Sequence, residues 1–111
     1  MVTIPGQPDL GNALDKLWKQ FLPQMNERVE AIDAAVSAFA AGSLTVDQRA
    51  AANSAAHKLA GVLGTFDLTR GTVLAREAEM LFSSESEIYE QTLPVLQNLA
   101  AQLREIVSSR K

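Results

Sequence analysis

The segment AAHKLAGVLGTF, residues 55–66, contains the only histidine of the 111-residue chain. The segment predicts a helix, because Leu59, Val62 and Phe66 recur at spacings of three and four residues. The histidine, His57, lies away from these apolar residues and among residues with small side chains. A solvated helix face usually carries Glu, Lys or Gln, so this face calls for another explanation.

A helical wheel at about 100° per residue places His57 opposite the apolar face and directs its ring toward solvent. The residues around it are small or polar, and we expect them to form a docking face: Ala50, Asn53, Ser54, Ala60, Gly61 and Gly64. An interior glycine lowers helix stability by roughly 0.5–1 kcal/mol relative to alanine. Gly61 therefore indicates that a partner approaches the backbone closely, whereas helix packing or a fraying end explains Gly64 equally well.

Helical periodicity extends along the whole chain, and the two-residue alternation of strands is absent. We predict an all-α fold: an antiparallel four-helix bundle with an extra N-terminal helical segment. The bundle is expected over residues 9–109, after an N-terminal tail over residues 1–8. Asp9 is the expected cap of the first helix, Pro23 is expected to kink or split it, and Gly42 to end it.

Two stretches have the form of a capping box, in which a Ser or Thr and a Glu or Gln three residues later cap a helix start. They are TVDQ at residues 45–48, before the helix of His57, and SESE at residues 84–87, before the last helix. Between them, Asp67 or Thr69 is able to cap the third helix. Because proline disrupts a helix interior, the last helix either begins near Pro94 or bends there.

Composition excludes several classes of function. Ten Lys and Arg against thirteen Asp and Glu give a formal net charge of −3, and no basic run indicates a nucleic-acid or membrane surface. With no cysteine and a single histidine, the chain offers neither disulfides nor a thiolate or histidine-rich metal site. No apolar run is long enough to span a bilayer, and the first residues lack the pattern of a signal peptide. We expect a cytoplasmic protein without a metal of its own.

The segment around His57 resembles the signature of histidine-containing phosphotransfer (HPt) domains. In that signature an Ala-His pair is followed by a leucine and then by a glycine four residues after the histidine. The matching residues of this chain are Ala56, His57, Leu59 and Gly61, followed by Gly64 and Phe66 at the later glycine and aromatic positions. Two positions differ: many members have lysine where this chain has Ala60, and glycine where it has Asp67.

The resemblance implies a phosphoryl carrier of two-component phosphorelays, in which Nε2 of His57 exchanges a phosphoryl group with an aspartate of a response-regulator receiver domain. A free imidazole has a pKa of about 6.5 and is mostly neutral in the cytoplasm, so it can act as a nucleophile. No carboxylate is evident within one turn of His57. The receiver is expected to supply Mg²⁺, so no cofactor is expected in this chain.

Further residues are assigned roles around the phosphoryl group. Lys58 is expected either to offset the charge of the phosphoryl oxygens or simply to be a solvated lysine. Asn53 or Ser54 is expected to hydrogen-bond the ring or the partner backbone, and Arg70 and Arg76 to frame the site from the neighbouring helix.

No glycine-rich phosphate-binding motif occurs, so we expect neither a kinase nor another self-sufficient enzyme. We expect a monomer, with a hybrid histidine kinase as a further candidate partner. The alternative function is a helical docking module that binds a receiver or another signalling domain without phosphorylation of His57. A third hypothesis is a generic helical bundle in which the histidine has no special role.

Overall fold

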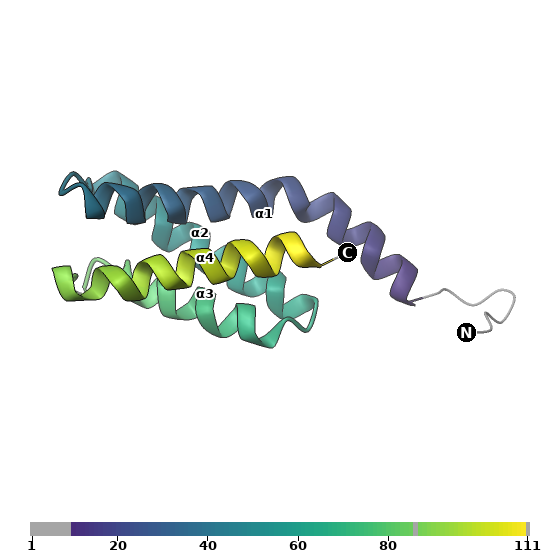
Figure 1. The fold of residues 1–111 in the computed structure, drawn as a ribbon. Helices are drawn as coiled ribbons and strands as arrows, with labels where there is room; N and C mark the ends of the chain where they lie inside the picture. The colour runs from purple at the N-terminus through teal and green to yellow at the C-terminus, as the bar shows by residue number, and fades with distance from the viewer. Residues whose placement is uncertain (1–9, 86, 111) are drawn as a thin grey trace, which may run out of the picture.

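A computed structural model describes residues 10–85 and 87–110. These residues form α1 (Leu10–Ala40), α2 (Val46–Thr65), α3 (Thr69–Leu81), a short 3-10 helix η1 (Glu90–Thr92) and α4 (Leu93–Ser109). Consecutive helices run antiparallel, and α1 also packs against α4, which closes a bundle with principal extents of 58 × 21 × 21 Å (Figure 1). No strand occurs in either described range, and the predicted all-α four-helix bundle is confirmed.

The core is filled by apolar side chains from all four helices, and no polar side chain of the described residues is buried with them. Its largest fully buried side chains are Phe82, Met25, Ile32, Leu59, Leu63, Leu96, Leu103 and Val107. On α2 the buried face also carries several alanines, whose small side chains allow α1 and α3 to pack closely against the α2 backbone.

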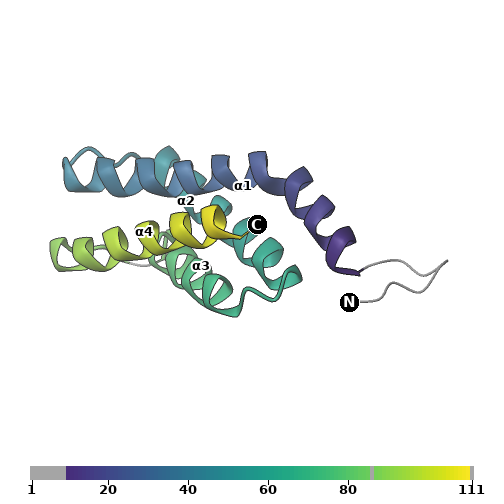
Figure 2. The same ribbon diagram turned by 45° about the vertical axis from the view of Figure 1, so that its right-hand side comes forward.

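The long first helix, α1, is continuous through Pro23, so the helix is not split there. It bends in the half that contains this proline (Figures 1 and 2), as expected where proline removes a backbone hydrogen bond and crowds the preceding turn. The predicted extra N-terminal segment is this half of α1 rather than a separate helix. Its first turns extend past the other helices, so Leu14 is 38% exposed although its spacing places it on the apolar stripe. The expected cap Asp9 and the tail over residues 1–8 lie outside the described residues.

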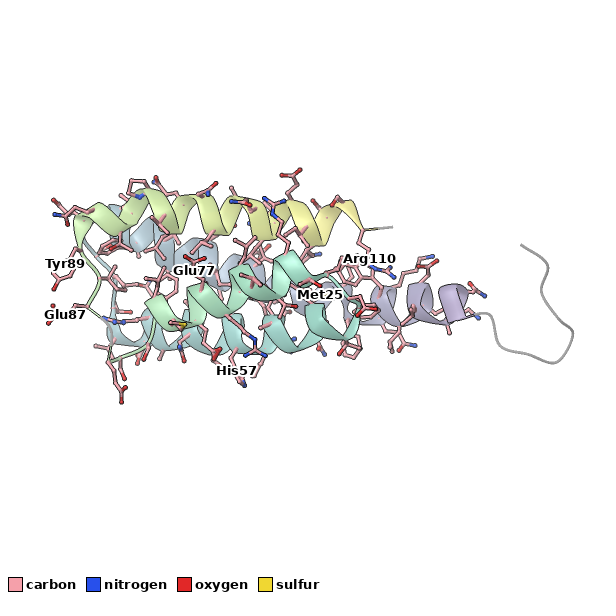
Figure 3. The ribbon with its side chains drawn as sticks, turned by 90° about the horizontal axis from the view of Figure 1, so that it is seen from below. Met25, His57, Glu77, Glu87, Tyr89 and Arg110 are labelled. Carbon is pink, nitrogen blue, oxygen red and sulfur yellow. The ribbon has the colours of Figure 1, made fainter. Side chains whose placement is uncertain are left out.

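Trp18 anchors the bent half of α1 to the bundle. It is 2% exposed and packs edge-on against Phe66 at the end of α2, with ring centroids 5.0 Å apart. The guanidinium of Arg110, just after α4, lies 5.0 Å from the Trp18 ring centroid, and its Nη1 is 3.2 Å from Oδ1 of Asp15. The C-terminal end of α4 is thereby fixed beside the bend, at the end of the molecule where Figure 3 labels Arg110.

The first helix ends in a Schellman motif, as the position of Gly42 predicts. Gly42 has a φ of 72°, and its N–H donates to the carbonyl of Phe39. The N–H of Ser43 donates to the carbonyl of Ala38 at 2.8 Å. These two bonds satisfy carbonyls that have no partner within the helix.

The second helix ends in the same motif, with Asp67 in the position that Gly42 occupies after α1. Asp67 has a φ of 57°, its N–H donates to Gly64, and the N–H of Leu68 donates to Leu63. Asp67 therefore ends α2 and does not cap α3, which begins at Thr69 without a side-chain cap. Glycine would adopt this left-handed backbone without strain, whereas aspartate adopts it at a cost.

The capping box at the start of α2 is confirmed. Oγ1 of Thr45 accepts a hydrogen bond from the N–H of Gln48, and Oε1 of Gln48 accepts one from the N–H of Thr45, both at 3.0 Å. The two contacts satisfy two backbone donors that the helix leaves without partners.

The capping box predicted at residues 84–87 is wrong. The last helix, α4, begins at Leu93, with Pro94 in its first turn, and residue 86 lies outside the described residues. A helix that started at residue 84 would place Pro94 in its interior, where the ring would break it, whereas proline is well accommodated at a helix start. Of the two alternatives for Pro94, the helix start is the one observed.

Candidate functional site

His57 lies at the surface of the bundle on α2, with its side chain 68% exposed (Figure 3). Leu59 and Leu63 of the same helix are completely buried. The predicted direction of the imidazole, away from the core and toward solvent, is confirmed.

The imidazole contacts a carboxylate on the neighbouring helix α3. Nδ1 of His57 lies 2.7 Å from Oε2 of Glu79, whose side chain is 24% exposed. An ionised carboxylate only accepts hydrogen bonds, so Nδ1 donates its proton to Glu79. In the neutral ring the lone pair is then on Nε2, which is the nitrogen available for a nucleophilic reaction.

Glu79 is the partner of His57 that the sequence prediction missed. The prediction considered carboxylates within one turn of His57, and Glu79 follows it by 22 residues. Only the packing of α3 against α2 brings the two side chains together.

Asn53, one turn before His57, fixes Glu79 from the backbone side. Its Nδ2 donates to the carbonyl oxygen of Glu79 at 2.7 Å. Glu79 is therefore bound to α2 both through its carbonyl and through its carboxylate. Asn53 was expected to contact the ring or a partner, but its amide is used within the fold, while Ser54 is exposed.

The predicted docking face is partly corrected by the structure. Ala50, Ser54, Gly61 and Gly64 are exposed, whereas Ala60 is 1% exposed and Asn53 is half-buried. Both corrected residues lie on the side of α2 that α3 covers, a side that a wheel of one helix cannot identify. His57 consequently lies at the border between the α3 contact and the open surface.

The bundle's own packing does not require the glycines beside His57. A Cβ atom added at Gly61 would have nothing within 4 Å, and one at Gly64 would meet Oγ1 of Thr72 at 3.6 Å, an ordinary contact. Gly61 lines an open, largely apolar groove of about 260 Å³ between α1 and the end of α2. The close approach of a partner from outside explains Gly61 better than any contact inside the molecule.

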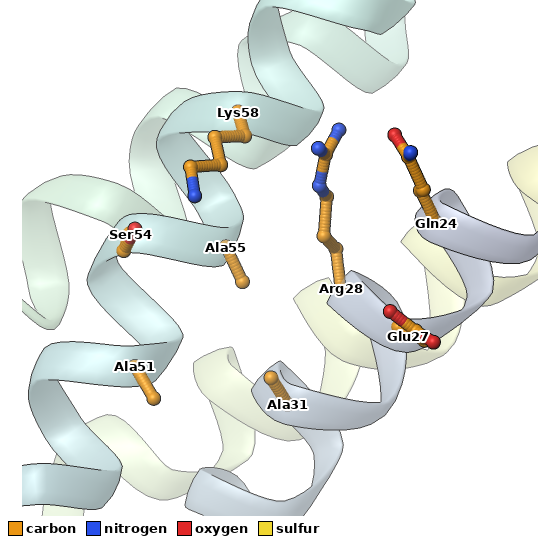
Figure 4. A pocket seen from close by; sticks show the side chains of 8 residues that line it. All are labelled: Gln24, Glu27, Arg28, Ala31, Ala51, Ser54, Ala55 and Lys58. Carbon is orange, nitrogen blue, oxygen red and sulfur yellow. The ribbon is translucent and has the colours of Figure 1, made fainter. Parts of the chain in front are cut away.

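Lys58 lies on the side of α2 that faces α1, in a groove that it shares with Arg28 and Ser54 (Figure 4). No hydrogen bond joins it to His57 or Glu79 in the described part of the chain. Its support of a phosphoryl group therefore stays a prediction.

Of the two arginines expected to frame the site, Arg70 does not do so. Its guanidinium donates to the side chain of Gln102 on α4, away from the α2–α3 border. Arg76 is an exposed residue of α3.

The site has no metal-binding cluster within residues 10–85 and 87–110, since no three His, Cys, Asp or Glu side chains gather there. Among the described helices, none combines the length and the hydropathy needed to cross a membrane.

Comparison with known proteins adds to this geometry. The family model described as Hpt domain matches residues 16–107, which reach from the bent half of α1 to the last turns of α4. Protein RcaC of Microchaete diplosiphon is 28% identical over 92 residues, which cover 83% of this chain but only 14% of RcaC. No solved structure matches the chain significantly. Since the family model spans most of the chain, including His57, the protein belongs to the Hpt domain family.

Proposed function

We propose that this chain is a histidine phosphotransfer module of a phosphorelay, in which His57 takes a phosphoryl group from the aspartate of one receiver domain and donates it to another. Hpt domains are phosphocarrier modules that work with receiver domains, and they are not kinases. The observation that carries the assignment of His57 is its exposed imidazole, with Nδ1 bound to Glu79 at 2.7 Å. Such a relay places the protein in the cytoplasm.

The geometry supports the following transfer step. Nε2 attacks the phosphorus of the receiver's aspartyl phosphate, the P–N bond forms, and the P–O bond to the aspartate breaks as the carboxylate leaves with the electron pair. Positive charge develops on the imidazole because Nε2 gives up its lone pair. The Glu79 carboxylate lies where it stabilises this charge, through the proton on Nδ1.

The surroundings of His57 suit this reaction with a large partner. An in-line attack needs the receiver's aspartate close to Nε2, so the receiver must approach the surface of α2. The exposed Ala50 and Gly61 present almost no side chain to such a partner. Mg²⁺ bound by the receiver would neutralise charge on the phosphoryl oxygens.

The test is phosphorylation of the purified domain by phosphoramidate, a small phosphodonor, and by receiver domains phosphorylated with acetyl phosphate. Intact mass would be compared for the wild type and His57→Gln, with circular dichroism to verify folding. We expect one acid-labile phosphate on the wild type and none on the variant.

Two outcomes would contradict the proposal. Phosphate that remains after His57→Gln would show that the site is elsewhere. A folded wild type that accepts phosphate from no donor, yet binds a receiver, would favour the alternative function, a docking module that is not phosphorylated.

A further inference from the structure

The groove that Lys58 shares with Arg28 and Ser54 lies between α2 and α1 (Figure 4). It has a volume of about 480 Å³ and is open to solvent. Its walls are low, since Ala31 of α1 and Ala51 and Ala55 of α2 line it. Two cationic side chains, Arg28 from α1 and Lys58 from α2, border this gap (Figure 4).

These two cations have no protein partner among residues 10–85 and 87–110. Neither Arg28 nor Lys58 makes a hydrogen bond or an ion pair with any residue in the described ranges. The other arginines that reach across the bundle are engaged: Arg49 with carbonyls after α3, Arg70 with Gln102, Arg104 with Asp33, and Arg110 with Asp15. Glu27 is the one carboxylate that lines the groove, so the cations there exceed the anions.

The position of the groove links it to the phosphotransfer site. Lys58 follows His57 directly, and Ser54 is one turn before it on the same exposed surface. A receiver domain that docks over Nε2 of His57 is large enough to extend over this neighbouring surface as well. Its phosphorylation site is itself acidic, because it holds the phosphorylated aspartate and the carboxylates that bind Mg²⁺.

The charge of the groove indicates that it binds an acidic side chain of the partner. The chain as a whole has a net charge of −3, which repels an acidic partner. In the groove, Lys58, which follows His57 in the chain, and Arg28 of α1 offset this repulsion locally where a carboxylate can enter. An arginine at the far wall adds geometric specificity, since its planar guanidinium can bind both oxygens of a carboxylate.

We propose that Arg28 and Lys58 form a carboxylate-binding groove that holds an acidic side chain of the receiver domain during docking over His57. The proposal rests on the phosphotransfer function and adds to it the contact that selects the partner. Arg28 and Lys58 act here on binding, while Nε2 of His57 carries out the chemistry.

The experiment measures transfer from phosphorylated receivers of the source genome to this chain as a function of receiver concentration and NaCl. The receiver that transfers fastest to the wild type is the probe. For Arg28→Gln/Lys58→Gln we expect the half-saturating receiver concentration to rise about tenfold at low salt, with a weaker dependence on NaCl. Phosphoramidate labelling of His57 is measured on each protein alongside, as the readout of the chemistry without a receiver.

The matched control is Lys16→Gln/Lys19→Gln, which removes the same charge from exposed positions of α1 outside the groove. A groove variant that behaves like this control would overturn the inference, as would a receiver panel of which no member binds the wild type. If the double variant unfolds, the single variant Lys58→Glu tests the groove instead. Lys58 is exposed, so the change should leave the fold intact, and the reversed charge should weaken receiver binding.

The two proposals fail separately. A wild type that phosphoramidate cannot label at His57 removes the proposed function. Normal labelling with an unchanged half-saturating concentration in the groove variant removes only the carboxylate-binding groove.

Discussion

The inner face of α2 carries Ala52, Ala56 and Ala60, each at most 1% exposed, and its outer face carries the exposed Ala50 and Gly61. Both faces include small residues, but in different surroundings. The inner alanines are small because α1 and α3 pack against them, whereas a Cβ at Gly61 would touch nothing within 4 Å. The bundle itself therefore explains the inner face, whereas the outer face is small without any internal packing reason, as the proposed docking of a partner requires.

The largest difference between the two faces is expected in the free energy of unfolding when an alanine on each face is replaced by leucine. Ala56→Leu should lower the free energy of unfolding by about 3 kcal/mol, because a fully buried site has no room for the new side chain. Ala50→Leu should change it by less than about 0.5 kcal/mol, since the residue is exposed. Urea denaturation of both variants measures the difference. Equal losses would show that the two faces are not packed differently.

Substitution of Glu79, which contacts His57 at the border between the two faces, should change the rate of phosphorylation rather than the stability of the fold. Removal of a hydrogen bond to a developing charge at this partly exposed site should slow phosphoramidate labelling of His57 about tenfold in Glu79→Ala. Glu79→Gln should lie between this variant and the wild type, because the amide oxygen still accepts from Nδ1. Glu77→Ala, an exposed change on the same helix, is the control. If both alanine variants labelled at the wild-type rate, Glu79 would have no part in the reaction.

Glycine-to-alanine substitutions, which add a single methyl group, compare a packed position with an open one. At Gly71 of α3 an added Cβ would lie 2.9 Å from Cδ1 of Leu63 and 3.2 Å from Cγ2 of Ile106, so Gly71→Ala should destabilise the fold by about 1 kcal/mol. Gly61→Ala should instead stabilise it by about 0.5–1 kcal/mol, the difference in helix propensity.

Thermal unfolding gives both values, and transfer kinetics give the functional counterpart. Gly61→Ala should raise the receiver concentration needed for half-maximal transfer while leaving phosphoramidate labelling unchanged. A Gly61→Ala protein that is more stable and equally active would mean that no partner approaches this backbone.

The smallest effects are expected at the two turns that end α1 and α2. Asp67 adopts a φ of 57° in the motif that Gly42 forms with a φ of 72°. Asp67→Gly should raise stability by about 0.5 kcal/mol, and Gly42→Asp should lower it by a similar amount, because an L side chain is strained in this conformation. Chemical denaturation of the two variants side by side checks the opposite signs. Changes of the same sign would show that the two turns are not equivalent.

Helix boundaries could be predicted where the deciding contacts are local. The box of Thr45 and Gln48 joins residues three apart, and Gly42 needs only its own backbone conformation, so both were predicted correctly. Residues 84–87 match the same pattern, but Pro94 requires α4 to begin later. A local pattern fails where a stronger constraint lies several residues away.

The candidate site could be predicted only as far as one helix determines it. The exposure of His57 follows from the wheel of α2, since Leu59 and Phe66 define the buried side. The burial of Ala60 and the contact with Glu79 depend on which side of α2 is covered by α3. That choice is made by tertiary packing, and no spacing within α2 encodes it.

The burial of Trp18 gives the protein a built-in optical probe. It is the only tryptophan of the chain, and its indole Nε1 is buried without a hydrogen-bond partner in the described structure. An indole in such apolar surroundings emits at shorter wavelength than one in water. Its ring contacts Phe66, which lines the groove that includes Gly61, so a partner that docks along that groove can alter the emission of Trp18. The association with a receiver lacking tryptophan can therefore be followed in real time on the unlabelled protein.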